Sequence, residues 1–290
     1  MFKIASLNNK NMNKFINLNE LRVKFNVLNE DFYHHYSDMS CINKFFARRN
    51  VRLLFMKDDL VGYLWATSYD RKYDVINSMY VEGERCLEEK YSSLVSSLRL
   101  RKPLIYSCEK NSYNYDILSK LGFRKTEGTY EMHTKVSSYD CDFPNEIFFE
   151  PVVKGKHEKI RCYIQNEVFK NDTRIPITVD DIYYDEIQNY YYPEGAILIK
   201  KNNEYVGYGQ IILNGTIPTI VNIGILKEFR GRGYGKLLMI YLLNHLKSNG
   251  FSEVDLKVSS NNPIALKLYN SLGFTLEKET HRWEYKKSTS

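Results

Sequence analysis

The chain has 290 residues, which exceeds a typical single domain and favours two domains of about 145 residues each. Its 43% hydrophobic and 26% charged residues are ordinary for a globular protein with a buried core. The formal net charge of +6 suits an acidic ligand, but it is too small and too dispersed to indicate a nucleic-acid-binding protein.

The cysteines and the N-terminal sequence indicate the compartment. The five cysteines are odd in number and contain no C-x-x-C pair, so neither a disulfide framework nor a zinc site is indicated. The first residues, MFKIASLNNKNMNKF, lack the apolar run of a signal peptide, and no long apolar stretch follows. We therefore expect a cytoplasmic protein with no membrane partner and no metal.

The first half reads as alternating strands and helices. A strand is expected at the N-terminus, residues 51–68 read as two strands joined by a polar turn, and residues 111–133 read as a helix, a Leu-Gly-Phe step and a strand. Residues 137–145, SSYDCDFPN, have the Ser, Asp, Pro and Asn content of a connection.

The second half repeats this order of elements and then continues. Thr178, with Asp181 three residues on, is the expected N-cap of one of its helices. The expected helices are 157–170, 178–192, 236–250 and 263–272; the expected strands are 146–153, 196–201, 205–213, 219–229 and 254–259, followed by a final hairpin of FTLEKE and RWEYKK.

Two matches in the same order indicate an internal duplication. Asn111 precedes Gly122 by the same eleven residues that separate Asn262 from Gly273, and both glycines lie in Leu-Gly-Phe. Upstream, Val-Gly-Tyr recurs near the start of the second strand of each strand pair. We therefore predict one domain over residues 1–136, a linker over 137–145 and a second domain over 146–290.

Residues 228–238, EFRGRGYGKLL, place three glycines and two arginines at the entry to an expected helix. The first N–H groups of a helix lack internal partners and carry a partial positive charge, so a glycine-rich entry favours an anion such as phosphate. Leu237 after Gly235-Lys236 excludes the nucleotide-triphosphatase loop, and Lys236 excludes the dinucleotide fingerprint, which needs glycine there.

The remaining pattern, R-x-x-G-x-G from Arg230 to Gly235, resembles that of the GNAT superfamily of acyl-CoA-dependent N-acyltransferases. The match extends to Ile225, five residues before the arginine, to Asn262-x-x-Ala265, and to Tyr269 four residues before Gly-Phe. The resemblance implies an α/β (α+β) fold of two tandem GNAT-like domains, each a mixed, mostly antiparallel sheet flanked by helices.

The same resemblance implies acetyl-CoA as cosubstrate and assigns residues to it. The loop amides would hold the pyrophosphate, with the two arginines adding charge, and the strand before the loop would pair with the pantetheine and polarise the thioester carbonyl. The implied cofactor-binding residues are Ile223, Gly224, Ile225, Arg230, Gly231, Arg232, Gly233, Tyr234, Gly235, Lys236 and Asn262. Strand parity would place Asn222 on the face of Gly224.

The implied reaction is attack of a neutral amine on the thioester, which needs a base, an oxyanion donor and an acid. Tyr269 is the implied acid. Where part of the family has a glutamate base, this chain has Lys257, so the base stays unassigned. The side chains weighed for it are His281, Glu279, Asp172 and Glu194.

The first half lacks the features of the site. Its counterpart of the glycine loop, YVEGERCLEEK at 80–90, has one glycine and four acidic residues, and Leu118 stands where the second half has Tyr269. We expect one working site, in residues 146–290, that acetylates a small-molecule or peptide amine. A non-catalytic acyl-CoA-binding pseudoenzyme and a Fem-type aminoacyl-tRNA-dependent ligase remain alternatives, and the oligomeric state is open.

Overall fold

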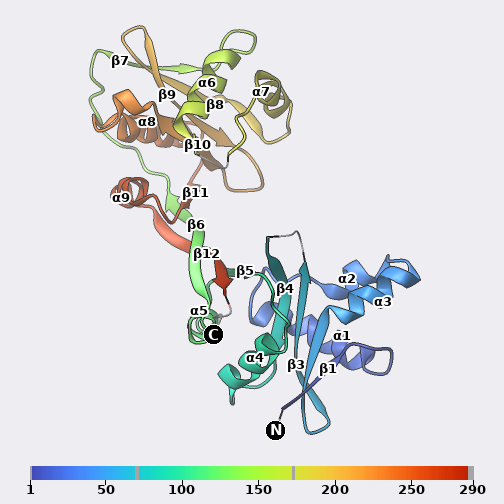
Figure 1. The fold of residues 1–290 in the computed structure, drawn as a ribbon. Coiled ribbons are helices and arrows are strands. Elements are labelled where there is room, and N and C mark those ends of the chain that lie inside the picture. The colour runs from blue at the N-terminus through green and yellow to red at the C-terminus, as the bar shows by residue number, and fades with distance from the viewer. Residues whose placement is uncertain (1, 69–71, 172–173, 287–290) are drawn as a thin grey trace. The chain divides into compact units, whose positions relative to one another are not determined.

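The structure is a computed structural model that describes residues 2–68, 72–171 and 174–286. The chain forms two compact units (Figure 1). The first unit contains Met1–Thr129, Ser259–Asn261 and Lys278–Ser290, and the second contains Tyr130–Val258 and Asn262–Glu277. The units therefore differ from the two sequence halves, because the end of the chain belongs to the first unit.

The first unit is a mostly antiparallel sheet in the order β1-β2-β3-β4-β5-β12. Only β4 and β5 run parallel, and they pair over two residues, Asp74↔Leu104 and Val75↔Ile105. The last strand, β12, closes this sheet through the register Thr280↔Glu109 to Tyr285↔Leu104. The elements are β1 (Phe2–Ser6), α1 (Met12–Glu20), η1 (Leu21–Lys24), α2 (Phe32–Ser37), α3 (Cys41–Arg49), β2 (Val51–Met56), β3 (Asp59–Ser68), β4 (Asp74–Val81), α4 (Leu87–Ser96), β5 (Leu104–Glu109) and α5 (Asn114–Lys120). Two further strands, β6 (Arg124–Lys135) and β12 (Thr275–Tyr285), have residues in both units.

The second unit repeats this plan in the strand order β6-β11-β10-β9-β8-β7. Its parallel pair, β10 and β11, also pairs over only two residues, Thr219↔Asp255 and Ile220↔Leu256. The helix α8 packs its leucines on the central strands, where Gly209 leaves room for Leu242. The elements are β7 (Ile147–Pro151), α6 (Glu158–Val168), α7 (Val179–Glu186), β8 (Tyr191–Lys201), β9 (Glu204–Ile212), β10 (Thr219–Ile225), η2 (Lys227–Phe229), α8 (Tyr234–Ser248), β11 (Glu253–Ser259) and α9 (Pro263–Ser271).

Local sequence signals explain several of the element boundaries. Thr178 and Asp181 form the expected capping box at the start of α7. Gly250, with φ of 82°, follows the end of α8 and supplies the left-handed residue that terminates many helices. None of the helices within the described ranges is both long and apolar enough to span a membrane.

Three expected elements are wrong. The strand expected over 219–229 ends at Ile225, and the short helix η2 follows it. The helix expected over 178–192 ends at Glu186, and Tyr191 already belongs to β8, because tyrosines suit a strand as well as a helix. The expected final hairpin is one continuous strand, β12, since the residues between FTLEKE and RWEYKK, Thr280 and His281, include no turn-forming glycine, proline or asparagine.

Candidate functional site

The glycine loop presents a run of free backbone amides at the start of α8. Gly231 and Gly233 have φ of 76° and 84°, a conformation that glycine adopts without strain. In the described part of the chain, no acceptor lies within hydrogen-bond reach of the amides of Gly231, Arg232, Gly233, Tyr234 and Gly235. A Cβ at Gly231 or Gly233 would meet no atom within 4 Å, so no other residue packs on the loop at these two positions. An anion can therefore approach the loop closely.

The predicted cofactor-binding residues include three basic residues, Arg230, Arg232 and Lys236, and each has a contact within the fold. The Lys236 amide donates to the Gly233 carbonyl at 2.9 Å, so it is already used as a helix hydrogen bond. Arg230 donates from Nε to the Ile225 carbonyl at 2.9 Å, which ties the loop to the end of β10. Arg232 is exposed, with its guanidinium 5.9 Å from the Phe229 ring, and its charge is available to an anion at the loop.

Strand β10 separates from β11 just before the loop. Pairing of the two strands stops at Ile220, while pairing with β9 continues to Ile225. Because the Leu226 amide donates to β9 and backbone groups alternate along a strand, the amides of Ile223 and Ile225 face the side that β11 leaves open. These two donors are therefore placed to bind an extended polar ligand.

A β-bulge interrupts β10 at Asn222, where the register with β9 shifts between Val221 and Gly224. Asn222 has φ of 53°, and its Nδ2 donates to Gln210 Oε1 at 3.1 Å. Asn222 and Gly224 share one face, as strand parity predicts: Asn222 bonds Gln210, which also accepts from Arg161 of α6, and Gly224 packs on Val168 of α6.

Tyr269 lies on α9 and is buried, with 5% of its surface exposed. Its hydroxyl donates to no group among the described residues, and its ring packs against Phe274. Burial raises the pKa of Tyr269 to about 12, so the phenol stays protonated at neutral pH. Asn262 has a structural contact, because its Oδ1 caps α9 by accepting the Ala265 amide at 3.1 Å.

The side chains weighed as the base are not gathered at this site. Glu279 and His281 belong to the first unit, where Lys110 and Lys125 hold Glu279 at 2.9 and 2.8 Å. Glu194 is exposed, and Asp172 lies outside the described residues. Lys257 pairs with Glu131 at 2.7 Å. The base therefore stays unassigned.

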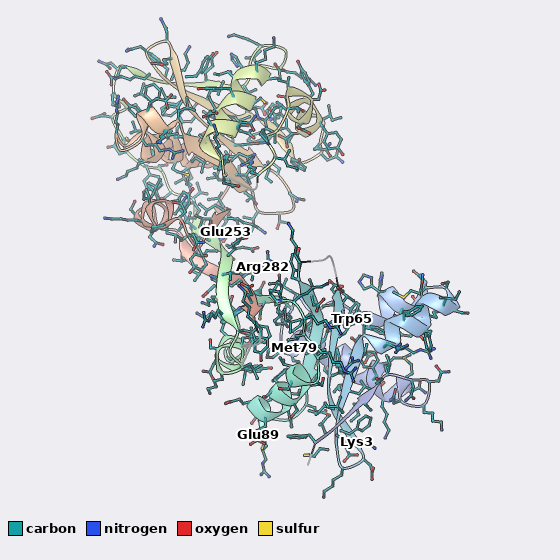
Figure 2. The ribbon with its side chains drawn as sticks, viewed as in Figure 1. Lys3, Trp65, Met79, Glu89, Glu253 and Arg282 are labelled. Carbon is teal, nitrogen blue, oxygen red and sulfur yellow. The ribbon has the colours of Figure 1, made fainter. Side chains whose placement is uncertain are left out.

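In the first unit, the parallel strands β4 and β5 correspond to β10 and β11, and two asparagine side chains bind their backbone groups. Asn29 donates from Nδ2 to the Met79 carbonyl on β4 at 3.0 Å; Met79 is labelled in Figure 2. Asn26 donates to the Ser107 carbonyl on β5 at 2.8 Å and accepts the Glu109 amide at 3.1 Å. Both asparagines are at most 5% exposed. We call Asn26 and Asn29 the asparagine plug. The sequence alone did not predict it, because two asparagines three residues apart form no motif that indicates such contacts.

A second group of ligand-type side chains lies on the strands of the second unit. His133, Asp255 and Glu277 bring ligand atoms within 4.8 Å of one another, and His133 Nδ1 lies 2.7 Å from Asp255 Oδ1. This contact is an ordinary histidine-carboxylate pair, so it assigns no metal.

Residues 165–274 match the model of the acetyltransferase (GNAT) family. This segment contains the splayed strand, the free amides and Tyr269 described above. The second unit therefore contains a segment that is similar to the GNAT family. The match covers less than half of the chain, and it includes only residues 259–261 of the first unit.

Curated relatives match part of the chain. The chain is 31% identical over 105 residues to a mycothiol acetyltransferase of Thermobispora bispora, covering 34% of this chain and 36% of the relative. It is 26% identical to that of Kocuria rhizophila over 52% of each chain. A 56-residue stretch is 41% identical to a [ribosomal protein bS18]-alanine N-acetyltransferase of Haemophilus ducreyi, covering 19% of this chain and 39% of the relative. The chain thus spans about a third to a half of the length of these relatives.

Solved structures with a similar fold align with nearly the whole chain. A GCN5-related N-acetyltransferase from Sphaerobacter thermophilus aligns over 98% of this chain and 95% of its own, with a TM-score of 0.58 and 14% identity. A tandem GNAT protein from the clavulanic acid biosynthesis pathway aligns over 100% of both chains, with a TM-score of 0.50 and 11% identity. The expected tandem GNAT fold, similar in layout to mycothiol synthase, is confirmed.

Proposed function

We propose that this protein is an acetyl-CoA-dependent N-acetyltransferase with one working site, in the second unit. The observation that carries the proposal is the run of five unpartnered amides, Gly231 to Gly235, which continues from the open edge of β10. Coenzyme A needs a site for its anionic pyrophosphate, which the loop would provide. It also needs a site for its extended, amide-bearing pantetheine chain, which β10 would provide.

The reaction follows from the groups along this path. The pyrophosphate binds the loop amides and Arg232, and the amides of Ile223 and Ile225 bind the pantetheine and the thioester oxygen. A neutral amine attacks the carbonyl carbon, and the negative charge that develops on oxygen is stabilised by fixed N–H donors. The C–S bond then breaks, and Tyr269 gives its proton to the leaving thiolate. No described side chain is assigned as the base that removes the proton of the amine.

The first unit does not take part in coenzyme binding in this proposal. Asn26 and Asn29 already occupy the hydrogen-bonding groups of β4 and β5 that would face a pantetheine chain. Displacing them would expose buried amides and carbonyls, at about 1–3 kcal/mol for each group left without a partner.

The proposal is tested by release of free thiol from acetyl-CoA in the presence of a panel of small amines and peptide N-termini. We expect thiol release that depends on one class of amine. Binding of acetyl-CoA without thiol release from any amine would favour the pseudoenzyme alternative. Absence of acetyl-CoA binding, measured by calorimetry, would overturn the assignment and revive the aminoacyl-tRNA-dependent ligase.

A further inference from the structure

A buried polar cluster surrounds Arg161 of α6 in the second unit. Arg161 is 1% exposed and forms ion pairs with Asp185 and Glu186 at the end of α7. Its Nη2 also donates to Gln210 Oε1 of β9 at 3.1 Å. The guanidinium carbon lies 5.1 Å from the centre of the Tyr208 ring.

Four polar atoms in this cluster are buried without a partner. They are Arg161 Nε, Gln165 Nε2, Glu186 Oε2 and the Tyr208 hydroxyl, and none has a hydrogen-bond partner in the described part of the chain. Each such atom costs about 1–3 kcal/mol when it is left unpaired. Arg161 contacts both Glu186 and Tyr208, and Gln165 follows it by one turn of α6, so the four atoms together call for an occupant that supplies the missing bonds.

The cluster adjoins the strand that leads to the proposed acetyl-CoA site. Asn222, the bulge residue of β10, donates to Gln210 Oε1, which also accepts from Arg161. Along α6, Arg161, Gln165 and Val168 share one face. Val168 packs on Gly224 so tightly that a Cβ on Gly224 would lie 2.0 Å from it. Arg161 Nε and Gln165 Nε2 thus lie on the face of α6 that covers β10.

The chemistry of these atoms describes the occupant. Arg161 and Gln165 need acceptors, Glu186 needs a donor, and the Tyr208 hydroxyl can serve as either. A hydroxyl group meets both demands, whereas an ammonium group only donates. Charge favours a cation, because Asp185 and Glu186 carry two negative charges against the single charge of Arg161, and the nearby Glu158 and Lys154 offset one another. An anionic acceptor is therefore disfavoured.

We propose that Arg161, Gln165, Glu186 and Tyr208 hold the acceptor, and that the acceptor is a cationic amine carrying hydroxyl groups near its reacting nitrogen. This inference rests on the proposed acetyltransferase function and deepens it. The hydroxyls of the acceptor bind the four unpaired atoms, and its nitrogen lies toward the bulge of β10 and the thioester.

The first test compares matched amines in the thiol-release assay. We expect serinol and ethanolamine to give kcat/KM at least about 10-fold above propylamine and putrescine, since one net hydrogen bond of about 1.4 kcal/mol corresponds to a factor of 10. Serinol should also raise the melting temperature of the acetyl-CoA complex. A preference for the hydroxyl-free amines overturns the inference, and so does the absence of both turnover and thermal shift with serinol.

The second test uses Tyr208→Phe, which removes only a hydroxyl that has no protein partner. Folding should be retained, the KM for serinol should rise about 10-fold, and the KM for acetyl-CoA should not change. The matched control is Tyr91→Phe in α4, which removes another buried unpaired hydroxyl, in the first unit, and should leave both constants unchanged. Glu186→Gln keeps the shape of the side chain and should weaken serinol as well. If amines turn over but both variants keep the wild-type KM for serinol, the cluster is not the acceptor site although the acetyltransferase stands.

Discussion

Gly233 is the residue at which the proposed coenzyme site is most sensitive to a side chain. It precedes α8 with φ of 84°, and its amide is one of the five that have no hydrogen-bond partner among the described residues. We expect Gly233→Asp to abolish acetyl-CoA binding, because the carboxylate would occupy the place of the phosphates and repel them. Calorimetric titration measures the loss.

Gly250→Asp is the matched control for this change. Gly250 has φ of 82° at the other end of the same helix, and a Cβ there would also meet nothing within 4 Å. The two variants therefore share the same backbone strain and the same added charge. Retained binding in Gly233→Asp, or loss in both variants, would remove the loop from the site.

Tyr269 provides a second test at the residue scale. If its hydroxyl protonates the leaving thiolate, Tyr269→Phe should lower kcat by roughly 10²–10⁴-fold with little change in the KM for acetyl-CoA. Burial raises the pKa of Tyr269 to about 12, so the neutral acid is present at every lower pH and wild-type kcat should show no loss from Tyr269 ionisation up to about pH 11.

Single-turnover kinetics checks the Tyr269 role when product release limits kcat. Tyr241→Phe is the control, since Tyr241 lies on α8 and stacks on Phe149 with ring centres 4.2 Å apart. Full activity in Tyr269→Phe would discard the acid role and leave the tyrosine as a packing residue beside Phe274.

At the scale of elements, the last strand of the chain completes the sheet of the first unit. Trp283 of β12 lies opposite Tyr106 of β5, is 2% exposed and packs edge-on against Tyr115. We expect Trp283→Ala to lower the free energy of unfolding of the first unit by about 3–5 kcal/mol, the usual cost of removing a buried aromatic ring.

Urea unfolding followed through Trp65 measures this effect, because Trp65 of β3 is then the single tryptophan and also belongs to the first unit (Figure 2). Arg282→Ala, one residue away on the opposite strand face, should cost at most about 1 kcal/mol, since it loses a contact with the Tyr73 ring. Equal losses in both variants would contradict the stabilising role of the Trp283 face.

At the scale of the whole molecule, the two units repeat one plan but differ in what lies between their parallel strands. The β4–β5 gap is bridged by Asn26 and Asn29, while the β10–β11 gap leaves amides free. We expect one acetyl-CoA per chain in calorimetric titration, and none in Gly233→Asp. Two sites of similar affinity would show that the asparagine plug opens, and would contradict a single working site.

The sequence alone determined the tandem GNAT fold and the loop before α8. These features depend on short-range patterns: glycines at fixed spacing, a capping box, and the Asn-to-Gly step that recurs in both halves. Residues close in sequence meet regardless of the rest of the fold, so their spacing is informative. The phosphate role of the loop and the acid role of Tyr269 stay predictions.

Only the tertiary structure decided which distant groups meet. The pairing of β12 with β5, the asparagine plug and the Arg161 cluster each join residues far apart in the chain. The bulge at Asn222 was not predicted either, because the register shift that defines it arises in the pairing of β10 with β9. Burial of polar groups such as Arg161 depends on packing of α6 and α7 over the sheet, and no local pattern encodes it.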